Sequence, residues 1–483
     1  MINSKLIEIL KTFSKQELRD FVKFTKISYF NKGKNYLPLL NVLRKFYPEF
    51  NNPELTKFYV YERLFQGKKY NDQVIRNMLS GLLKICGQFI VINNIKFNST
   101  DYNIILADEL KNRMLFKHAE SYINKSLKEI DETAVDKDYF RKRYELMQVK
   151  REITHGLNNT KETIECLSAE AVDFFLFFLL ETSRHVEEMV VFNHNLNANF
   201  ENHLTFKLIE NLNIENLSRY FTRSNIKNYK IAELFAVHIN LLIDYTNEVL
   251  FDKFRSLLKE SFGELSRWGK YNMYLCLENA CIRLQEIDEI KYREILLEIY
   301  REQLKEKLYN NSESSPMAID MFRNIVINAL RLKHFKWTEF FITEFIRTLS
   351  ADHRENMYNF SFSLLNFEKR NFEKSLNYII KLKYDTFVFK YDVKVLTLMV
   401  YFELGYTEEA ISMIDSFRHF INETPSISDY IREIHTNFIK FLFEIIRHRN
   451  GFKSRETQRL KSEITASRVR NKDWLLEKLE TEH

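Results

Sequence analysis

Apolar side chains recur along most of this chain at spacings of three and four residues, which is the pattern of one face of an α-helix. Beyond residue 99 the pattern is almost uninterrupted, and short polar stretches separate one helical segment from the next. The pattern therefore predicts a long series of helices with the approximate spans 101–114, 117–132, 136–156, 160–192, 204–222, 228–246, 249–262, 270–287 and 289–309.

The first hundred residues predict shorter helices. Ser14 and Glu17 form a capping box, in which each side chain satisfies a backbone N–H of the other residue and so marks a helix start. We expect a loop over 28–35, around Gly33, and a helix that has Pro53 at its first position. The expected helices span 2–11, 14–26, 36–46, 53–65 and 72–91.

Composition supports a helical fold. The 483 residues include 9 Gly and 5 Pro, whereas an average soluble protein has about 7% Gly and 5% Pro. Hairpin turns and tight turns between strands and helices consume Gly, Asn and Asp. A chain this poor in Gly and Pro is therefore poor in sheets, and we predict an all-α fold.

A repeat emerges when the chain is aligned with itself at a shift of 35 residues. The shift places Phe340, Ser375 and Ala410 at one position, each just after a short turn. Four further positions stay apolar in all three copies: Ile325, Phe360 and Val395; Ala329, Leu364 and Met399; Leu332, Phe367 and Phe402; and Phe341, Leu376 and Ile411. Because three of these positions share one helix face, each copy predicts a hairpin of two helices.

Residues 320–420 resemble the tetratricopeptide repeat family, whose unit is about 34 residues long. Tyr401, Gly405 and Ala410 match the aromatic, tight-turn and small-residue positions of that unit, whereas Ser375 and Phe340 depart from its small residue. The resemblance implies an irregular α-α superhelix, a TPR-like solenoid, which we extend over most of 99–450, with Ala119 in a further degenerate copy. A non-repetitive helical bundle is the alternative.

Polar stretches divide the chain further. NNSESSP at 310–316 and HNLNANFENH at 194–203 have the composition of linkers. With the repeat, they predict a basic helical N-terminal module at 1–98, a helical-repeat body at 99–310, TPR-like repeats at 317–450 and C-terminal helices at 451–483.

Charge is uneven along the chain. Residues 1–98 carry 17 Lys and Arg against 7 Asp and Glu, while the formal net charge of the whole chain is +6. Such asymmetry is one mark of a surface that binds nucleic acid. A solvated surface in a lysine-rich sequence explains it equally simply.

Residues 55–89 resemble the helix-turn-helix of winged-helix regulators through Leu64-Phe65, Gly67, Arg76-Asn77, Leu79-Ser80 and Leu82. In such a domain the second helix enters the major groove of DNA. The resemblance implies that Arg76, Asn77 and Lys84 face bases and that Lys68 and Lys69 meet phosphates. We favour a helical cap on the solenoid over a DNA reader, because the end of a repeat array must be covered and the motif lacks its structural context.

Motifs of common chemistries are absent from the sequence. It contains no G-x-G-x-x-G, P-loop, G-x-S-x-G or H-E-x-x-H pattern. His185 and Glu188 have the spacing of half a metal site, but no second such pair accompanies them. We predict no catalytic, cofactor or metal residues and no enzymatic activity.

Two apolar features have structural explanations. The four cysteines, Cys86, Cys166, Cys276 and Cys281, are scattered, which is typical of buried free thiols in a reducing compartment. The run of Phe and Leu at 174–192 predicts a central buried helix, with an exposed partner-binding patch as the alternative.

The sequence therefore predicts a non-enzymatic helical-repeat scaffold that binds a protein partner. The alternative is a DNA-binding transcriptional regulator whose N-terminal module reads DNA and whose repeat body acts as a sensor. Because MINSKLIEIL lacks the long apolar core of a signal peptide, we expect a cytoplasmic protein without a membrane partner. The oligomeric state does not follow from the sequence.

Overall fold

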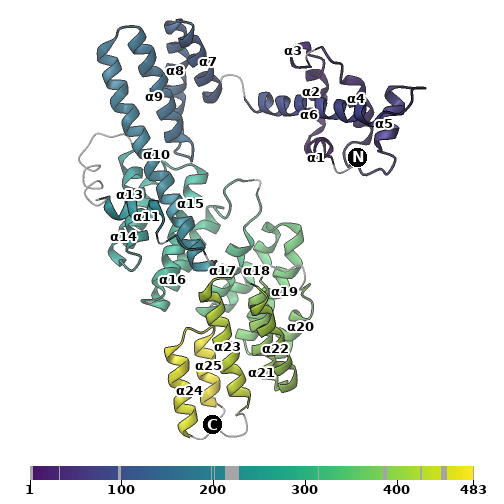
Figure 1. The fold of residues 1–483 in the computed structure, drawn as a ribbon. Coiled ribbons are helices and arrows are strands. Elements are labelled where there is room, and N and C mark those ends of the chain that lie inside the picture. The colour runs from purple at the N-terminus through teal and green to yellow at the C-terminus, as the bar shows by residue number, and fades with distance from the viewer. Residues whose placement is uncertain are drawn as a thin grey trace. The chain divides into compact units, whose positions relative to one another are not determined.

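The structure is a computed structural model, built from helices and their connections (Figure 1). It describes residues 4–31, 33–95, 99–196, 198–200, 202–212, 228–313, 315–383, 389–424, 427–447 and 454–481. Across these ranges no strand is present, and consecutive helices pack against each other in neighbouring pairs. The predicted all-α fold is confirmed, and the pairing is compatible with a helical solenoid.

The helices form two compact units. Unit 1 comprises Met1–Asp131 and Glu145–Leu167, and unit 2 comprises Glu132–Tyr144 and Ser168–His483. Two long helices, α9 (Tyr139–Gly156) and α10 (Thr160–Asn195), contribute residues to both units. The finer boundaries near residues 98, 310 and 450 stay predictions.

Unit 1 begins with a small helical module. The predicted capping box at Ser14 is confirmed, since Ser14 Oγ accepts from the Glu17 N–H at 3.1 Å and Glu17 Oε2 accepts from the Ser14 N–H at 2.7 Å. The helices of the module are α1 (Lys5–Thr12), α2 (Lys15–Phe24), α3 (Ser28–Asn31), α4 (Leu37–Leu43) with the 3₁₀ turn η1 (Arg44–Phe46), α5 (Lys57–Leu64) and α6 (Asp72–Asn94).

Two details of the N-terminal prediction are wrong. The expected loop at 28–35 begins with one helical turn, α3, before Gly33 at φ +75°. The helix expected from Pro53 begins instead at Lys57, because Thr56 caps it: Thr56 Oγ1 accepts from the Tyr59 N–H at 3.1 Å. The Thr56 side chain satisfies a backbone N–H of the first turn, which has no partner within the helix, and this stabilises a helix start at Lys57.

Helix α6 is the longest element of the module. Ile75, Leu82 and Phe89 place one of its faces in the core. Gly81 lets the ring of Tyr36 lie directly on the helix, where an added Cβ would overlap the ring. Among the described residues, one helix is long and apolar enough to cross a membrane, by length and composition only, and it is α6.

The remaining helices follow as pairs. Unit 1 continues with α7 (Thr100–Asn112) and α8 (Phe116–Asp131). Residues from 213 onward in the helix predicted over 204–222 lie outside the described part, as does residue 314 of the 310–316 linker. After α10, unit 2 contains α11 (Leu204–Asn211), α13 (Tyr229–Ile243), α14 (Glu248–Ser261), α15 (Arg267–Leu284), α16 (Glu289–Lys305), α17 (Ile319–Arg331), α18 (Phe335–Phe345) with η2 (Ile346–Thr348), α19 (Ala351–Glu368), α20 (Phe372–Ile379), α21 (Lys390–Leu404), α22 (Thr407–Asn422), α23 (Asp429–Arg447), α24 (Ser454–Ala466) and α25 (Lys472–Thr481).

Five hairpins, α7–α8, α9–α10, α17–α18, α19–α20 and α21–α22, share one type of turn. The turn residue has a left-handed conformation, and the next residue donates its N–H to the carbonyl five positions earlier at 2.8–3.0 Å. This Schellman motif ends the first helix. The left-handed residues are Met114, Asn158, Lys333, Arg370 and Gly405, and five positions after each lies a small residue: Ala119, Thr163, Thr338, Ser375 and Ala410.

The repeat alignment is wrong by two residues in its first copy. A shift of 35 residues assigned Phe340 to the small-residue position, but its side chain is 56% exposed. Thr338 occupies that position and is fully buried, as Ser375 and Ala410 are. The turn geometry is therefore more regular than the sequence spacing.

This register gives a stability prediction. We expect Thr338→Phe to lower the free energy of unfolding of unit 2 by about 1–3 kcal/mol, because the larger side chain overpacks the helix pair. Phe340→Ala should change it by less than about 0.5 kcal/mol, as is usual for exposed positions. Urea titration followed by tryptophan fluorescence measures both variants, because all three tryptophans, Trp268, Trp337 and Trp474, belong to unit 2. Equal destabilisation by the two changes would contradict the register.

Candidate functional site

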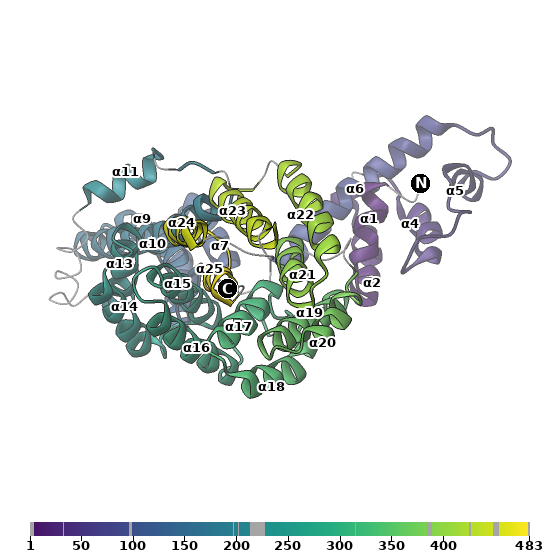
Figure 2. The ribbon, with the colours of Figure 1, turned by 90° about the horizontal axis from the view of Figure 1, so that it is seen from below.

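The inner side of unit 2 is one candidate site. In the view of Figure 2, helices α13 to α22 follow a curve, and side chains of α25 meet α21 on its inner side. Side chains from α17, from the turn between α19 and α20, and from α21 meet α25 and the two residues before it. We call this surface the inner face and define it by Arg331, Arg370, Asp392, Met399, Phe402 and Glu403.

Helix α25 is held on the inner face mainly at Glu403. The Trp474 Nε1–H donates to Glu403 Oε1 at 2.8 Å, and Lys478 Nζ lies 2.8 Å from the same oxygen. The Trp474 ring meets the Phe402 ring edge-on, with 5.4 Å between their centroids. Because Lys478 is buried, its ammonium group depends on Glu403 and its neighbour Glu477 for compensation.

Residues just before α25 form a half-buried charge cluster with the inner face. Arg323 Nε and Arg470 Nη2 contact the two oxygens of Asp392 at 2.5 and 3.1 Å. Burial alone would raise the pKa of Asp392, but the two guanidinium groups outweigh it and hold the pKa below its ordinary value. The cluster therefore keeps Asp392 ionised and ties the segment before α25 to α17 and α21.

A groove remains open beside α25. Its cavity volume is about 410 Å³, and its walls come from α16, α17, α19, α21 and α25. Side chains of both signs line it, and four ion pairs at 2.6–2.8 Å join them: Arg293–Glu289, Lys333–Glu368, Arg370–Glu477 and Lys478–Glu403. The surface is therefore polar and close to neutral in charge.

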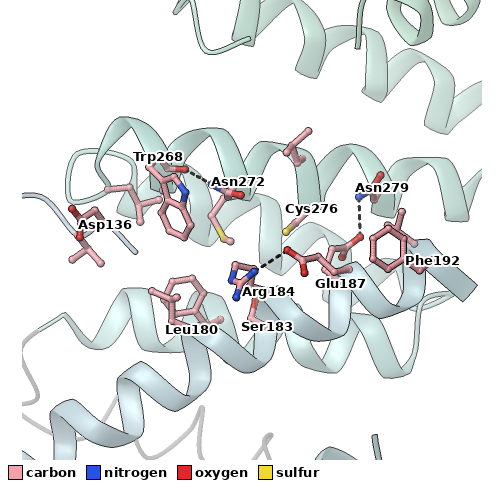
Figure 3. Close-up of a pocket in the computed structure, with 18 residues that line it drawn as sticks. Asp136, Leu180, Ser183, Arg184, Glu187, Phe192, Trp268, Asn272, Cys276 and Asn279 are labelled. Carbon is pink, nitrogen blue, oxygen red and sulfur yellow. Dashed lines mark hydrogen bonds and ion pairs between the residues drawn. The ribbon is translucent and has the colours of Figure 1, made fainter. Parts of the chain in front are cut away.

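The second candidate site is a cavity between α10 and α15, with a volume of about 210 Å³. Figure 3 shows Ser183, Arg184 and Glu187 on the α10 side and Trp268, Cys276 and Asn279 on the α15 side. Most of the wall is apolar, with Leu180, Val191, Phe192, Phe235, Leu265 and Met273 among the lining residues. An apolar cavity with a few convergent polar groups is the usual form of a ligand pocket.

Three polar residues at this cavity, Ser183, Glu187 and Asn279, belong to a network centred on the buried Glu187. Glu187 Oε2 lies 3.0 Å from His238 Nε2, and Glu187 Oε1 accepts from Asn279 Nδ2 at 2.9 Å and Arg283 Nη1 at 3.2 Å. The other ring nitrogen of His238, Nδ1, lies 2.7 Å from Ser183 Oγ. One donor atom each from Glu187, His238 and Cys276 lie within 4.8 Å of one another.

Electrostatics fix the charge of two members of the network. Burial alone would raise the pKa of Glu187, but hydrogen bonding to His238 and the charge of Arg283 lower it to about 2. Burial raises the pKa of the Cys276 thiol well above its ordinary value. Glu187 is therefore ionised and Cys276 is a neutral thiol, so Cys276 lacks the thiolate character of a catalytic nucleophile.

Helix α10 also carries His185 and Glu188, the pair that has half a metal site's spacing in the sequence. His185 and Glu188 point away from the network: His185 Nδ1–H donates to the Glu181 carbonyl at 2.8 Å, and Glu188 pairs with Arg184 at 2.8 Å. Glu187, between them in sequence, is buried instead. The sequence signal for this network is His238, a single histidine in the mostly apolar run IAELFAVHINLLI of α13.

The Phe and Leu run at 174–192 is a mixed case. Leu176, Leu179 and Leu180 are buried, as predicted for a central helix, whereas Phe174 is 54% and Phe192 is 48% exposed. The four cysteines are all free and buried, as predicted.

The five predicted nucleic-acid contacts lie together on the turn before α6 and along α6. Lys68, Lys69, Arg76, Asn77 and Lys84 are all exposed. Three of them have neighbours: Arg76 pairs with Asp72 of its own helix, Asn77 Oδ1 accepts from Gln73 Nε2 at 3.0 Å, and Lys68 Nζ lies 5.9 Å from the centroid of the Phe65 ring. The next described element after α6 is the helix α7, so the described residues that follow α6 contain no wing hairpin.

Comparison of the chain with protein-family models, with curated proteins and with solved structures found no match.

Proposed function

We propose that this chain is a non-enzymatic helical-repeat scaffold that binds a protein partner at the inner face of unit 2. The observation that carries the proposal is the position of α25. Helix α25 of the chain itself packs with α23 and α24 and places two side chains on α21, where Trp474 and Lys478 share the Glu403 carboxylate and the Trp474 ring meets Phe402. A surface that accommodates one amphipathic helix has the shape and chemistry to accept a segment of another protein.

The groove beside α25 is the proposed place of contact. Its Lys333–Glu368 and Arg370–Glu477 pairs are partly exposed, and such pairs contribute about 0–1 kcal/mol each to stability. A charged side chain of a bound protein can therefore replace one member of either pair with little loss of free energy. Mixed charge fits a partner segment that itself carries both acidic and basic side chains.

Charge reversal tests this proposal. We expect Lys333→Glu with Arg370→Glu to abolish capture of the partner from the native cells, because both positions line the groove. The control is Lys336→Glu with Lys374→Glu, which carries the same charge change at exposed positions of α18 and α20 outside the groove. The proposal fails if the two double variants retain the same proteins, or if the unmodified chain captures none above a tag-only background.

DNA binding by the N-terminal module is a second candidate, favoured by the exposure of all five candidate side chains in a basic segment. It predicts that duplex DNA binds more weakly as salt rises, because phosphate contacts release counterions. The triple change Lys68→Glu, Lys69→Glu and Arg76→Glu should remove this binding in a fluorescence anisotropy titration. Unchanged binding by the triple variant would exclude a DNA-reading role for these residues.

A further inference from the structure

We propose that Glu187, His238 and Cys276 form a binding site for a divalent transition metal ion, best matched by Zn²⁺, whose fourth coordination position opens on the α10–α15 cavity. The site is separate from the inner face and does not depend on the proposed protein partner.

The three donor types and their spacing carry the proposal. One carboxylate oxygen, one imidazole nitrogen and one sulfur come from α10, α13 and α15 and lie within 4.8 Å of one another. Tetrahedral Zn²⁺ with bonds of about 2.0–2.3 Å keeps its ligand atoms roughly 3.3–3.6 Å apart. Glu187 Oε2 and His238 Nε2, at 3.0 Å, already approach that spacing, and the 4.8 Å bound on the whole set exceeds it by roughly 1 Å.

Neighbouring side chains orient two of the donors. Ser183 Oγ lies 2.7 Å from His238 Nδ1 and can accept a hydrogen bond from Nδ1–H. That leaves the Nε2 lone pair for a metal. Asn279 and Arg283 both bond Glu187 Oε1, which directs Oε2 toward His238. Such outer hydrogen bonds fix the orientation of ligands at protein metal sites.

The cavity supplies the remaining position. Ser183, Glu187 and Cys276 are part of its lining, so an ion between the three donors is reachable from it. Zinc sites with three protein ligands and one open position hold a water molecule or a ligand atom there. The apolar wall of Phe235, Leu265 and Trp268 suits the organic part of such a ligand.

Charge and proton balance select the ion. With neutral His238 protonated at Nδ1, the Cys276 thiol releases one proton, and the thiolate and the Glu187 carboxylate neutralise the two charges of the metal. Arg283 keeps its positive charge beside the site and repels a bound cation. A hard cation, which forms no strong bond to sulfur, is therefore disfavoured. A thiolate and an imidazole favour zinc over magnesium or calcium.

The test uses Co²⁺ as a spectroscopic probe and Zn²⁺ in competition, with the full chain. We expect one equivalent of Co²⁺ to bind with a thiolate-to-metal charge-transfer band, one proton to be released, and Zn²⁺ to remove the band. Cys276→Ser should abolish the band. The matched controls are Cys281→Ser, a buried cysteine on the same helix, and His435→Gln, a buried histidine outside the cluster; both should keep it.

A second variant keeps the proposal falsifiable if Cys276→Ser does not fold. Ser183→Ala leaves all three donors in place and removes only the orienting hydroxyl, so we expect the band to persist while affinity falls about 10–100-fold. Absence of a stoichiometric band in the unmodified chain would overturn the proposal. An undiminished band in folded Cys276→Ser, or loss of the band in Cys281→Ser instead, would overturn it as well.

Discussion

Glu278→Gln should make unit 2 more stable above neutral pH and remove much of the dependence of its stability on pH between about 5 and 8. Glu278 lies in α15, is buried, and its Oε1 has no hydrogen-bond partner within the described residues. Burial raises the pKa of this carboxyl from 4.5 to about 8, and the side chain of Gln303 offsets part of the effect. Glu278 is therefore protonated in the folded chain at neutral pH.

The direction of the pH effect follows from proton binding. Between pH 4.5 and about 8 the folded chain keeps a proton on Glu278 that the unfolded chain has released, so the free energy of unfolding falls as pH rises. At about 1.4 kcal/mol per pKa unit, the full loss by pH 8 is on the order of 4–5 kcal/mol. Glutamine does not ionise and therefore lacks this slope.

Urea unfolding at pH 5, 6, 7 and 8, followed by tryptophan fluorescence, measures the effect in unit 2. We expect Glu278→Gln to match the original chain at pH 5 and to exceed it by about 3–4 kcal/mol at pH 8, according to the same linkage. Glu294→Gln is the control, because Glu294 is exposed on the adjacent helix α16. If Glu278→Gln keeps the pH slope of the original chain, Glu278 is ionised in the folded state.

Local sequence signals predicted the helices well because they depend on neighbours in the chain. The capping box of Ser14 and Glu17 forms as expected, and so do the hairpins around Ser375 and Ala410. The fixed shift failed at Thr338 because the spacing between copies varies: residues 338 and 375 are 37 apart, whereas 375 and 410 are 35 apart. The turn, rather than the number of residues between turns, is what repeats.

The candidate sites depend on contacts that periodicity does not encode. Glu187 meets His238, 51 residues later, and Arg283, 96 residues later. Periodicity assigns Glu187 to a helix face but does not say which helix covers that face. The same holds for Trp474 on Glu403, 71 residues away. The sequence therefore predicted a repeat scaffold without its inner face or its buried network.

Glu187→Ala should destabilise unit 2 by about 3–5 kcal/mol at pH 7, because removing one member of a buried ion pair leaves the other charge uncompensated. Arg283 Nη1 bonds Glu187 at 3.2 Å, and its Nε and Nη2 have no hydrogen-bond partner within the described ranges. His238 and Asn279 also lose a partner. Glu188→Ala, one residue away, is the control: its carboxylate is 54% exposed and pairs with Arg184 at the surface, so its loss should be below about 1 kcal/mol.

Acid unfolding separates the charge of Glu187 from its packing. The pKa of Glu187 is lowered from 4.5 to about 2, so its stabilising contribution is complete above pH 4.5 and is lost as pH falls toward 2. The stability gap between the original chain and Glu187→Ala should therefore narrow as pH falls below 4.5. Tryptophan fluorescence in urea at pH 7, 4 and 3 measures it, with a chelator present so that any bound metal makes no contribution. A gap that stays constant over this range would show that Glu187 acts by packing alone, whereas a narrowing gap identifies its charge as the centre of the network.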